Sequence, residues 1–297
     1  MLTNPLFTGC ASALVTPFTQ SGALDEAALR RLIALQREAE MDALVLLGTT
    51  GEPCTLTMSE RERIIAIGME ESGAMPVIVG TGSNDTRRAI EYARQAKELG
   101  ASGQLSVTPY YNKATQAGLV RHFGAILDSA ELPMILYNVP GRTGVNLSAE
   151  TAAELAVHPL IAGIKEASGD PALSADILGR TQGMLPVYCG NDDIILPLMA
   201  MGAVGAISVV SNVVPIQTRA ITKACLSGCY DQARDAQSAL LPLIRALFAQ
   251  VSPIPVKAAL ARLGLIEEVL RLPLTPLEEP HRLKLEALMW DMGLLRD

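Results

Sequence analysis

Histidine and cysteine clusters are missing from this sequence. Its three histidines lie far from one another, and its five cysteines are scattered without a Cys-x-x-Cys pair. A zinc site or a disulfide framework needs such groupings, so we expect neither, and the odd, scattered cysteines favour a reducing compartment. We therefore predict a cytoplasmic protein that uses no metal and no cofactor.

Positive charge and long apolar runs are also scarce. The formal net charge is −7, which argues against nucleic acid or an anionic membrane surface as a partner. No run reaches the ~18 apolar residues of a membrane span, because Arg245 interrupts the apolar stretch at 240–251. The segment 1–15 lacks the basic start of a signal peptide, so none is expected.

Short apolar segments alternate with longer amphipathic ones along most of the chain. The composition is globular, with 49% hydrophobic and 19% charged residues. The short segments are apolar nearly throughout, which is typical of parallel strands covered on both faces. The predicted strands are Cys10–Thr16, Ala43–Gly48, Pro76–Gly82, Gly103–Thr108, Met134–Asn138, Ile161–Lys165, Pro186–Gly190 and Gly205–Val210.

The segments between these strands carry helix start and stop signals. Ser59 and Glu62 form a predicted capping box, Asp170 precedes a first-turn proline, and Gly100 ends a helical segment. Eight strand–helix units favour an α/β fold, a (β/α)8 TIM barrel over residues 1–226. The alternative, a Rossmann-like sheet, lacks a G-x-G-x-x-G motif after the first strand.

Residues 227–297 show helical patterns only, and we predict a C-terminal helical appendage packed on the barrel. The expected helices are Tyr230–Val251, Pro255–Leu263 and Thr275–Met292, the last with a capping box in TPLE. The first carries an apolar stripe that serves either packing within the chain or a subunit interface. The stripe consists of Leu240, Leu243, Ile244 and Leu247.

The carboxyl ends of the predicted strands carry hydroxyl groups and a single lysine, Lys165. Chemistry in (β/α)8 barrels takes place at this end of the strands. A lysine here is either a solvated rim residue or, in a water-poor cavity, a nucleophile. Model lysines have a pKa of ~10.4, and burial can lower it by up to ~3–5 units, which yields an amine able to attack a carbonyl. The position therefore suits Schiff-base chemistry.

Two loops after predicted strands add candidate binding groups. GTTGE, residues 48–52, puts Thr49 and Thr50 beside glycine-flanked N–H groups that could bind a carboxylate; otherwise it is an ordinary glycine-rich loop. YNVPGRTG, residues 137–144, offers the Tyr137 phenol for proton transfer and Arg142 for a bidentate carboxylate contact. Taken singly, Tyr137 could equally be a core tyrosine and Arg142 a surface charge.

GTTGE, TPYYN, LYNVPGRTG and GIKEASGD, in this order and spacing, resemble the dihydrodipicolinate synthase family of the pyruvate-dependent class I aldolases and lyases. The resemblance extends from 13–18 to 270–277 and covers nearly the whole chain. It implies that Lys165 forms an imine with pyruvate and that Thr50 helps to hold the pyruvate carboxylate. Condensation with aspartate 4-semialdehyde would give 4-hydroxy-tetrahydrodipicolinate, the first committed step towards diaminopimelate and lysine.

The resemblance also implies roles for four further residues. Tyr137 would shuttle protons together with Thr49 and with Tyr111, which the family contributes across a subunit contact. Arg142 would bind the carboxylate of aspartate 4-semialdehyde, and the backbone carbonyl of Ile207 would lie near the lysine. A tyrosine shared between subunits implies at least a dimer, and commonly a homotetramer.

Feedback inhibition by lysine, common among bacterial members, is where the chain departs from the resemblance. Their inhibitor pocket carries histidines soon after GTTGE and a glutamate after GTG. The matching positions here are Met58, Arg61 and Arg88, with only Asn84 and Tyr110 retained. A cation at Arg88 opposes a cationic ligand, so we predict weak or absent inhibition by lysine.

Two rival functions stay open at this stage. One is a sister enzyme with the same imine chemistry, such as N-acetylneuraminate lyase or a keto-deoxy sugar acid aldolase; such lyases generally lack an arginine at the place of Arg142. The other is a non-catalytic regulator that keeps the barrel. The presence of the lysine, tyrosine, threonines and arginine together argues against it.

Overall fold

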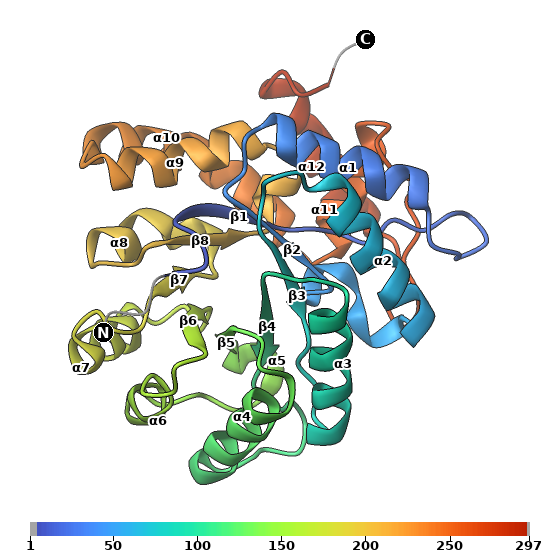
Figure 1. Cartoon of the computed structure of the whole chain (residues 1–297). Helices are drawn as coiled ribbons and strands as arrows, with labels where there is room; N and C mark the ends of the chain where they lie inside the picture. Colours follow the sequence, from blue (N-terminus) through green and yellow to red (C-terminus); the bar gives the residue numbers. More distant parts are fainter. Residues whose placement is uncertain (1–4, 296–297) are drawn as a thin grey trace.

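The computed structural model describes residues 5–295, in which eight parallel strands close into a barrel in sequence order (Figure 1). This confirms the predicted TIM barrel. The strands are β1 (Gly9–Ala13), β2 (Ala43–Leu46), β3 (Val77–Gly80), β4 (Gly103–Val107), β5 (Met134–Asn138), β6 (Ile161–Glu166), β7 (Val187–Cys189) and β8 (Gly205–Ser208). Each overlaps a predicted strand, and β5 matches its predicted bounds.

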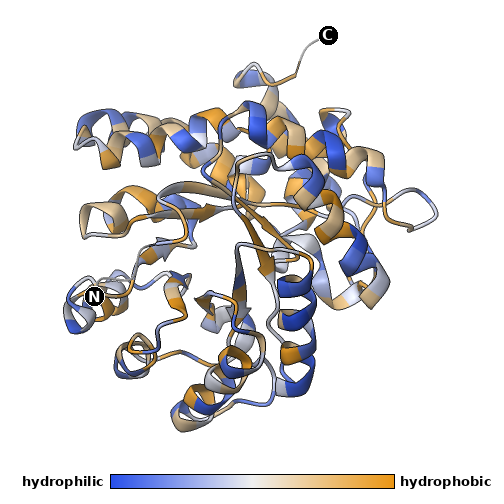
Figure 2. Cartoon of the chain, viewed as in Figure 1, coloured by the Kyte–Doolittle hydropathy of each residue, from blue (hydrophilic) through white to orange (hydrophobic). Residues whose placement is uncertain are grey.

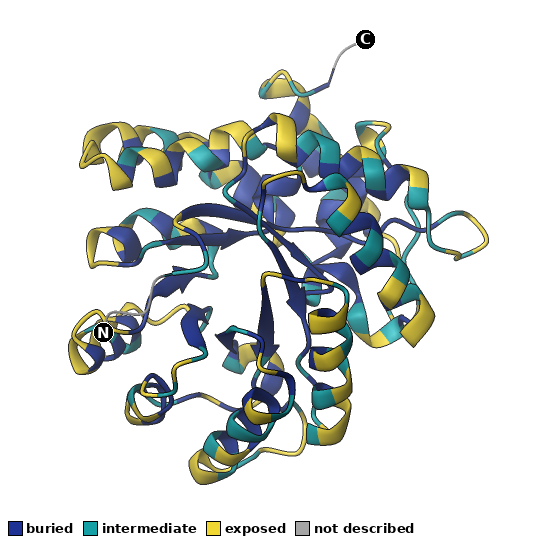
Figure 3. Ribbon diagram, viewed as in Figure 1, coloured by how far each residue is buried: buried dark blue, intermediate teal, exposed yellow. Residues whose placement is uncertain are grey.

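The strands are buried on both faces, which explains their continuous apolar sequence (Figure 3). Side chains pointing outward join the larger core between the sheet and the helices, and side chains pointing inward fill the barrel. Small residues such as Ala11 and large ones such as Tyr137 and Tyr188 belong to this interior. Phe7 stacks on Tyr188 with ring centroids 4.4 Å apart, below the start of β1. The amino end of the barrel is thereby plugged.

Amphipathic helices cover the outside of the barrel, with their apolar faces turned inward (Figure 2). They are α1 (Glu26–Glu38), α2 (Met58–Glu71), α3 (Thr86–Glu98), α4 (Gln116–Ala130), α6 (Ala149–Leu155), α7 (Pro171–Thr181), α8 (Ile195–Ala200) and α9 (Pro215–Leu226). The four-residue helix α5 (Pro140–Thr143) lies directly after β5. Short 3-10 turns follow β2 (η1, Thr49–Gly51; η2, Pro53–Thr55), β7 (η3, Asp192–Ile194) and β8 (η4, Val210–Asn212).

Two of the predicted helix ends are confirmed and one start is wrong. Asp170 caps α7 through the N–H of Ala172, and Gly100 follows α3 with φ +86. The capping box of α2 is formed by Thr57 and Glu60, two residues before the predicted pair. Both overlapping pairs fit the box pattern, but only Thr57 is extended, with ψ 164, as a cap residue must be.

The C-terminal helices are α10 (Tyr230–Leu247), α11 (Ile254–Arg262) and α12 (Glu279–Asp291). The first and last are shorter than predicted, and α11 has the predicted length but begins one residue earlier. The TPLE box does not form, because α12 begins later and its cap, Glu278, makes no side-chain capping bond. The four stripe residues of α10 are buried within the chain, so packing within the chain explains them. The division of the chain into a barrel at 1–226 and a helical region at 227–297 stays a prediction. Residues 1–4 and 296–297, at the outer ends of these two regions, lie outside the described residues. The first of these stretches is also the start of segment 1–15, for which no signal peptide is expected. Between residues 5 and 295, no helix is long and apolar enough to cross a bilayer.

Candidate active site

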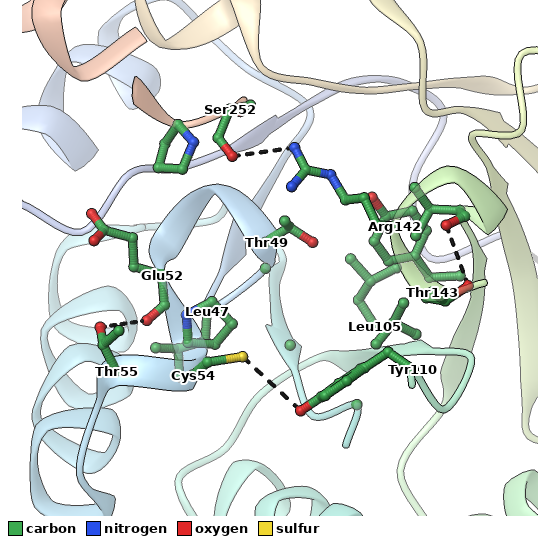
Figure 4. A pocket seen from close by; sticks show the side chains of 18 of the residues that line it. Leu47, Thr49, Glu52, Cys54, Thr55, Leu105, Tyr110, Arg142, Thr143 and Ser252 are labelled. Carbon is green, nitrogen blue, oxygen red and sulfur yellow. Dashed lines mark hydrogen bonds between the residues drawn. The ribbon is translucent and has the colours of Figure 1, made fainter. Parts of the chain in front are cut away.

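A cavity of about 330 Å³ opens at the carboxyl ends of β2 to β5 (Figure 4). Its walls come from the turns η1 and η2, from the ends of β3, β4 and β5, and from α5. Two segments of the C-terminal region complete it, at 251–253 and 273–274. The lining is mostly apolar, with Thr49, Tyr137 and Arg142 as polar groups on different walls.

Lys165 lies behind this cavity, next to Tyr137. Its side chain is buried at 5% exposure, and its Nζ is 4.6 Å from the centroid of the Tyr137 ring. On the β7 side, a Cβ added at Gly190 would come within 3.0 Å of the lysine Cε, so glycine at 190 leaves room for the lysine chain. The lysine is therefore a buried group with an aromatic neighbour and not a solvated rim residue.

The register between β5 and β6 sets the lysine and the tyrosine opposite each other. Tyr137 pairs with Lys165, and the next pair is Asn138 with Glu166. Asn138 donates from Nδ2 to the Glu166 carboxylate at 2.8 Å, on the side of the strands that faces away from the barrel interior. Burial raises the pKa of Glu166, and the bonds from Asn138 and Ser168 partly offset that rise. Sequence reasoning missed this pair, although both residues stand inside quoted motifs.

The turn after β2 presents Thr49 to the cavity and buries Thr50. Thr49 lines the cavity, while Thr50 has 3% exposure within the turn. Thr16, at the end of the first predicted strand, donates from Oγ1 to the carbonyl of Gly51 at 2.8 Å and fixes the turn from the β1 side. The chain then leaves the turn at Glu52, which has a left-handed φ of +52.

Arg142 extends from α5 on the opposite wall of the cavity, across from Thr49 (Figure 4). Its guanidinium donates to the backbone carbonyl of Ser252 at 3.2 Å. This bond spans 110 residues of sequence, and no local pattern predicts it. The arginine is thereby held over the cavity with donors still available for a carboxylate, since guanidinium has five N–H groups.

At the far end of the cavity lie Cys54 and Tyr110, whose sulfur and hydroxyl are 4.0 Å apart. Burial raises the pKa of Tyr110. Beneath them Arg61 is buried at 1% exposure, stacks 3.8 Å over the Tyr92 ring and donates to the carbonyl of Gly80 at 2.8 Å. Burial lowers the pKa of Arg61 to about 10, so it stays a cation at neutral pH.

Tyr111 and Ile207 do not line the cavity within a single chain. Tyr111 is 88% exposed, with a left-handed φ of 75, and its N–H donates to the carbonyl of Thr143 at 3.2 Å. Ile207 is fully buried in β8, where it pairs with Ala11 of β1. Over residues 5–295, His, Cys, Asp and Glu side chains do not gather in threes as metal ligands do.

A (β/α)8 barrel with a buried lysine beside a tyrosine at the carboxyl end of its strands has the architecture of the class I aldolases. The model of the dihydrodipicolinate synthetase family matches residues 6–291, and the chain belongs to this family.

Individual relatives agree with that assignment. The chain is 50% identical over 270 residues to 4-hydroxy-tetrahydrodipicolinate synthase of Exiguobacterium sibiricum, covering 91% of this chain and 92% of the relative. It is similar to the chloride-inhibited dihydrodipicolinate synthase of Acinetobacter baumannii complexed with pyruvate, at 42% identity and a TM-score of 0.95, with 97% and 99% of the two chains covered. A monomeric dihydrodipicolinate synthase variant gives 42% identity, a TM-score of 0.95 and 98% coverage of both chains.

Proposed function

We propose that this chain is a 4-hydroxy-tetrahydrodipicolinate synthase, which condenses pyruvate with aspartate 4-semialdehyde through an imine on Lys165. The observation that carries the proposal is the buried Lys165 nitrogen beside Tyr137, at a cavity that Arg142 overhangs. Membership of the family and the relatives' names support it.

The chemistry begins with attack of the neutral Lys165 amine on the ketone carbon of pyruvate. Loss of water gives an iminium, which draws electrons from the adjacent methyl carbon. The methyl carbon then loses a proton, and the iminium becomes an enamine. The enamine attacks the aldehyde, and Tyr137 passes protons during these steps. After the amino group of the second substrate closes the ring onto the imine carbon, the Lys165 amine is released.

The remaining residues bind and position the substrates. Thr50 holds the pyruvate carboxylate, and Arg142 holds the carboxylate of aspartate 4-semialdehyde. Thr49 continues the proton path from Tyr137, and we assign the backbone carbonyl of Ile207 to a position near the Lys165 amine, behind the cavity. Pyruvate is bound by neutral hydrogen-bond donors and aspartate 4-semialdehyde by the Arg142 cation. A protein with a net charge of −7 can therefore still bind two anionic substrates.

Assembly completes the site. Tyr111 is exposed in the single chain, which supports its insertion into the site of a second copy. We therefore propose that the protein is at least a dimer, and that two such dimers form a homotetramer that acts in the cytoplasm.

Borohydride reduction tests the imine. With pyruvate present, peptide mapping should find the reduced adduct at Lys165 and none at Lys257, which is buried in an ion pair and serves as the internal control. An unmodified Lys165 overturns the proposal and favours a non-catalytic barrel.

The second substrate needs its own assay. The rate of condensation of pyruvate with aspartate 4-semialdehyde is compared with the rate of cleavage of N-acetylneuraminate or a keto-deoxy sugar acid. Faster cleavage of a sugar acid would place the chain with the sister aldolases.

A further inference from the structure

A buried ion pair joins the turn after β2 to the C-terminal region. The Glu52 carboxylate accepts from the Lys257 ammonium at 2.6 Å, and the two side chains are 1% and 0% exposed. Lys257 lies on α11, 205 residues further along the chain. Its nitrogen also lies 4.3 Å from the ring centroid of Phe18. Nothing in the proposed chemistry uses this pair.

The same carboxylate is held from a second direction. Its other oxygen accepts the backbone N–H of Arg271 at 3.0 Å. The Arg271 guanidinium donates to the carbonyl of Thr55 at 2.8 Å and also bonds Gly22 and Glu60. Both 3-10 turns after β2 are therefore tied to residues that follow β8 in sequence.

The geometry of Glu52 links these ties to the cavity. This residue ends η1 and begins η2 in the left-handed region, so the chain reverses there. In Figure 4 its carboxylate lies on the far side of the turn from the Thr49 hydroxyl, which faces the cavity. Moving the carboxylate moves the turn, and the turn carries Thr49 and Thr50.

Stability alone is a weak reason for such a pair. Desolvation of two charges consumes much of their attraction, and replacing buried pairs by apolar residues is often neutral or stabilising. A fully buried, hydrogen-bonded pair does, however, fix the relative position of the two segments that carry it. Here the first segment, the turn after β2, lines the cavity through Thr49. The second, α11, is flanked in sequence by Pro253 and Leu274, which line another wall.

We propose that Glu52 and Lys257 are positioning residues, which hold the 48–52 turn so that Thr50 meets the carboxylate of the keto acid. This inference rests on the proposed function for the identity of the substrate. The claim that the ion pair fixes the 48–52 turn does not depend on that function. Loss of the pair should weaken keto-acid binding with little effect on the imine chemistry itself.

The first experiment measures the turn without any substrate. Hydrogen–deuterium exchange is followed in wild type, E52Q, K257M and the double variant E52Q/K257M, which leaves no unpaired buried charge. The matched control is R282Q, which removes another ion pair of the C-terminal region, between Arg282 and Glu268, away from the cavity. We expect faster exchange over residues 48–56 in the pair variants and wild-type exchange there in R282Q. Unchanged exchange over 48–56 overturns the proposal.

The second experiment measures the consequence for binding. The pyruvate concentration that half-saturates borohydride trapping at Lys165 should rise at least ~10-fold in E52Q/K257M, while the limiting trapping rate stays within ~3-fold. A merely structural role would lower the unfolding temperature and leave this concentration unchanged, and that result overturns the positioning role. If wild type forms no adduct, the proposed function fails, and the exchange result still decides whether the pair holds the turn.

Discussion

The Lys165 nitrogen lies 4.6 Å from the centre of the Tyr137 ring, and the two residues are paired across β5 and β6. Each strand presents its side chain to the barrel interior, so the amine and the phenol-bearing ring meet in a buried space. The cavity reaches Tyr137 but has no wall from Lys165 itself. Of these two residues, the tyrosine is therefore the one that a ligand in the cavity contacts.

Tyr137→Phe should separate binding from proton transfer. The ring still packs against Lys165, but the hydroxyl is lost, so we expect kcat to fall about 10²- to 10⁴-fold, as for removal of a general acid–base group. Steady-state condensation rates and borohydride trapping measure the two effects. A kcat within fivefold of wild type would rule out the phenol as the proton carrier.

Arg142→Ala should weaken binding of the second substrate alone. Charge-assisted hydrogen bonds contribute about 1.5–3 kcal/mol, which corresponds to an increase of roughly 10- to 150-fold in KM for aspartate 4-semialdehyde. Arg142→Lys keeps the charge without the bidentate geometry, so its KM for aspartate 4-semialdehyde should lie between those of wild type and Arg142→Ala. Pyruvate trapping at Lys165 serves as the control and should be unchanged; a selective loss of trapping would assign Arg142 to pyruvate instead.

Tyr111 should act in the site of a neighbouring subunit. Tyr111→Ala and Lys165→Ala are each expected to be inactive when pure. Mixed after dissociation and reassociation, they should regain activity, because some sites combine an intact lysine with an intact tyrosine. Activity that never returns on mixing, in samples shown by native mass spectrometry to contain hybrids, would place both residues in one chain's site.

His122 should make stability depend on pH. It is buried with Nδ1 2.9 Å from the Thr86 hydroxyl, and burial lowers its pKa from 6.5 to about 4. The folded state therefore favours the neutral ring, so this contribution is complete above pH 6.5 and is lost as the pH falls towards 4. The loss is about 3 kcal/mol.

The check is urea unfolding at pH 7 and pH 4.5. His122→Asn should show a smaller difference in unfolding free energy between the two pH values than wild type does. Equal differences would mean that other groups dominate the acid dependence.

Lysine should inhibit weakly or not at all. Arg61 is a buried cation stacked on the Tyr92 ring, and Arg88 pairs with Glu91 on the same ring. Two guanidinium groups oppose an ammonium ligand. Titration of the condensation reaction with L-lysine tests this, and strong inhibition at sub-millimolar lysine would contradict it.

The barrel could be predicted because each strand carries its own signal. Met134–Asn138 is apolar, bounded and followed by a proline loop, and its predicted limits hold. The predicted start of α2 is wrong because two overlapping capping boxes fit the local sequence pattern. The extended backbone at Thr57 decides between them.

Contacts between distant segments could not be predicted in the same way. Glu52 with Lys257 and Arg142 with Ser252 are pairings that only the closed fold creates. Lys257 stands in the predicted helix Pro255–Leu263, yet nothing local distinguishes a buried lysine in an amphipathic helix from a solvated one. The exposure of Tyr111 likewise follows from the fold and not from its sequence neighbours.

The late position of the segments at 251–253 and 273–274 has a consequence for biosynthesis. When translation has reached residue 226, all eight strands have been made, yet the residues that form one wall of the pocket have not been synthesised. The pocket is therefore completed only after residue 274 has been made, and until then the nascent barrel lacks the wall whose Ser252 carbonyl holds Arg142.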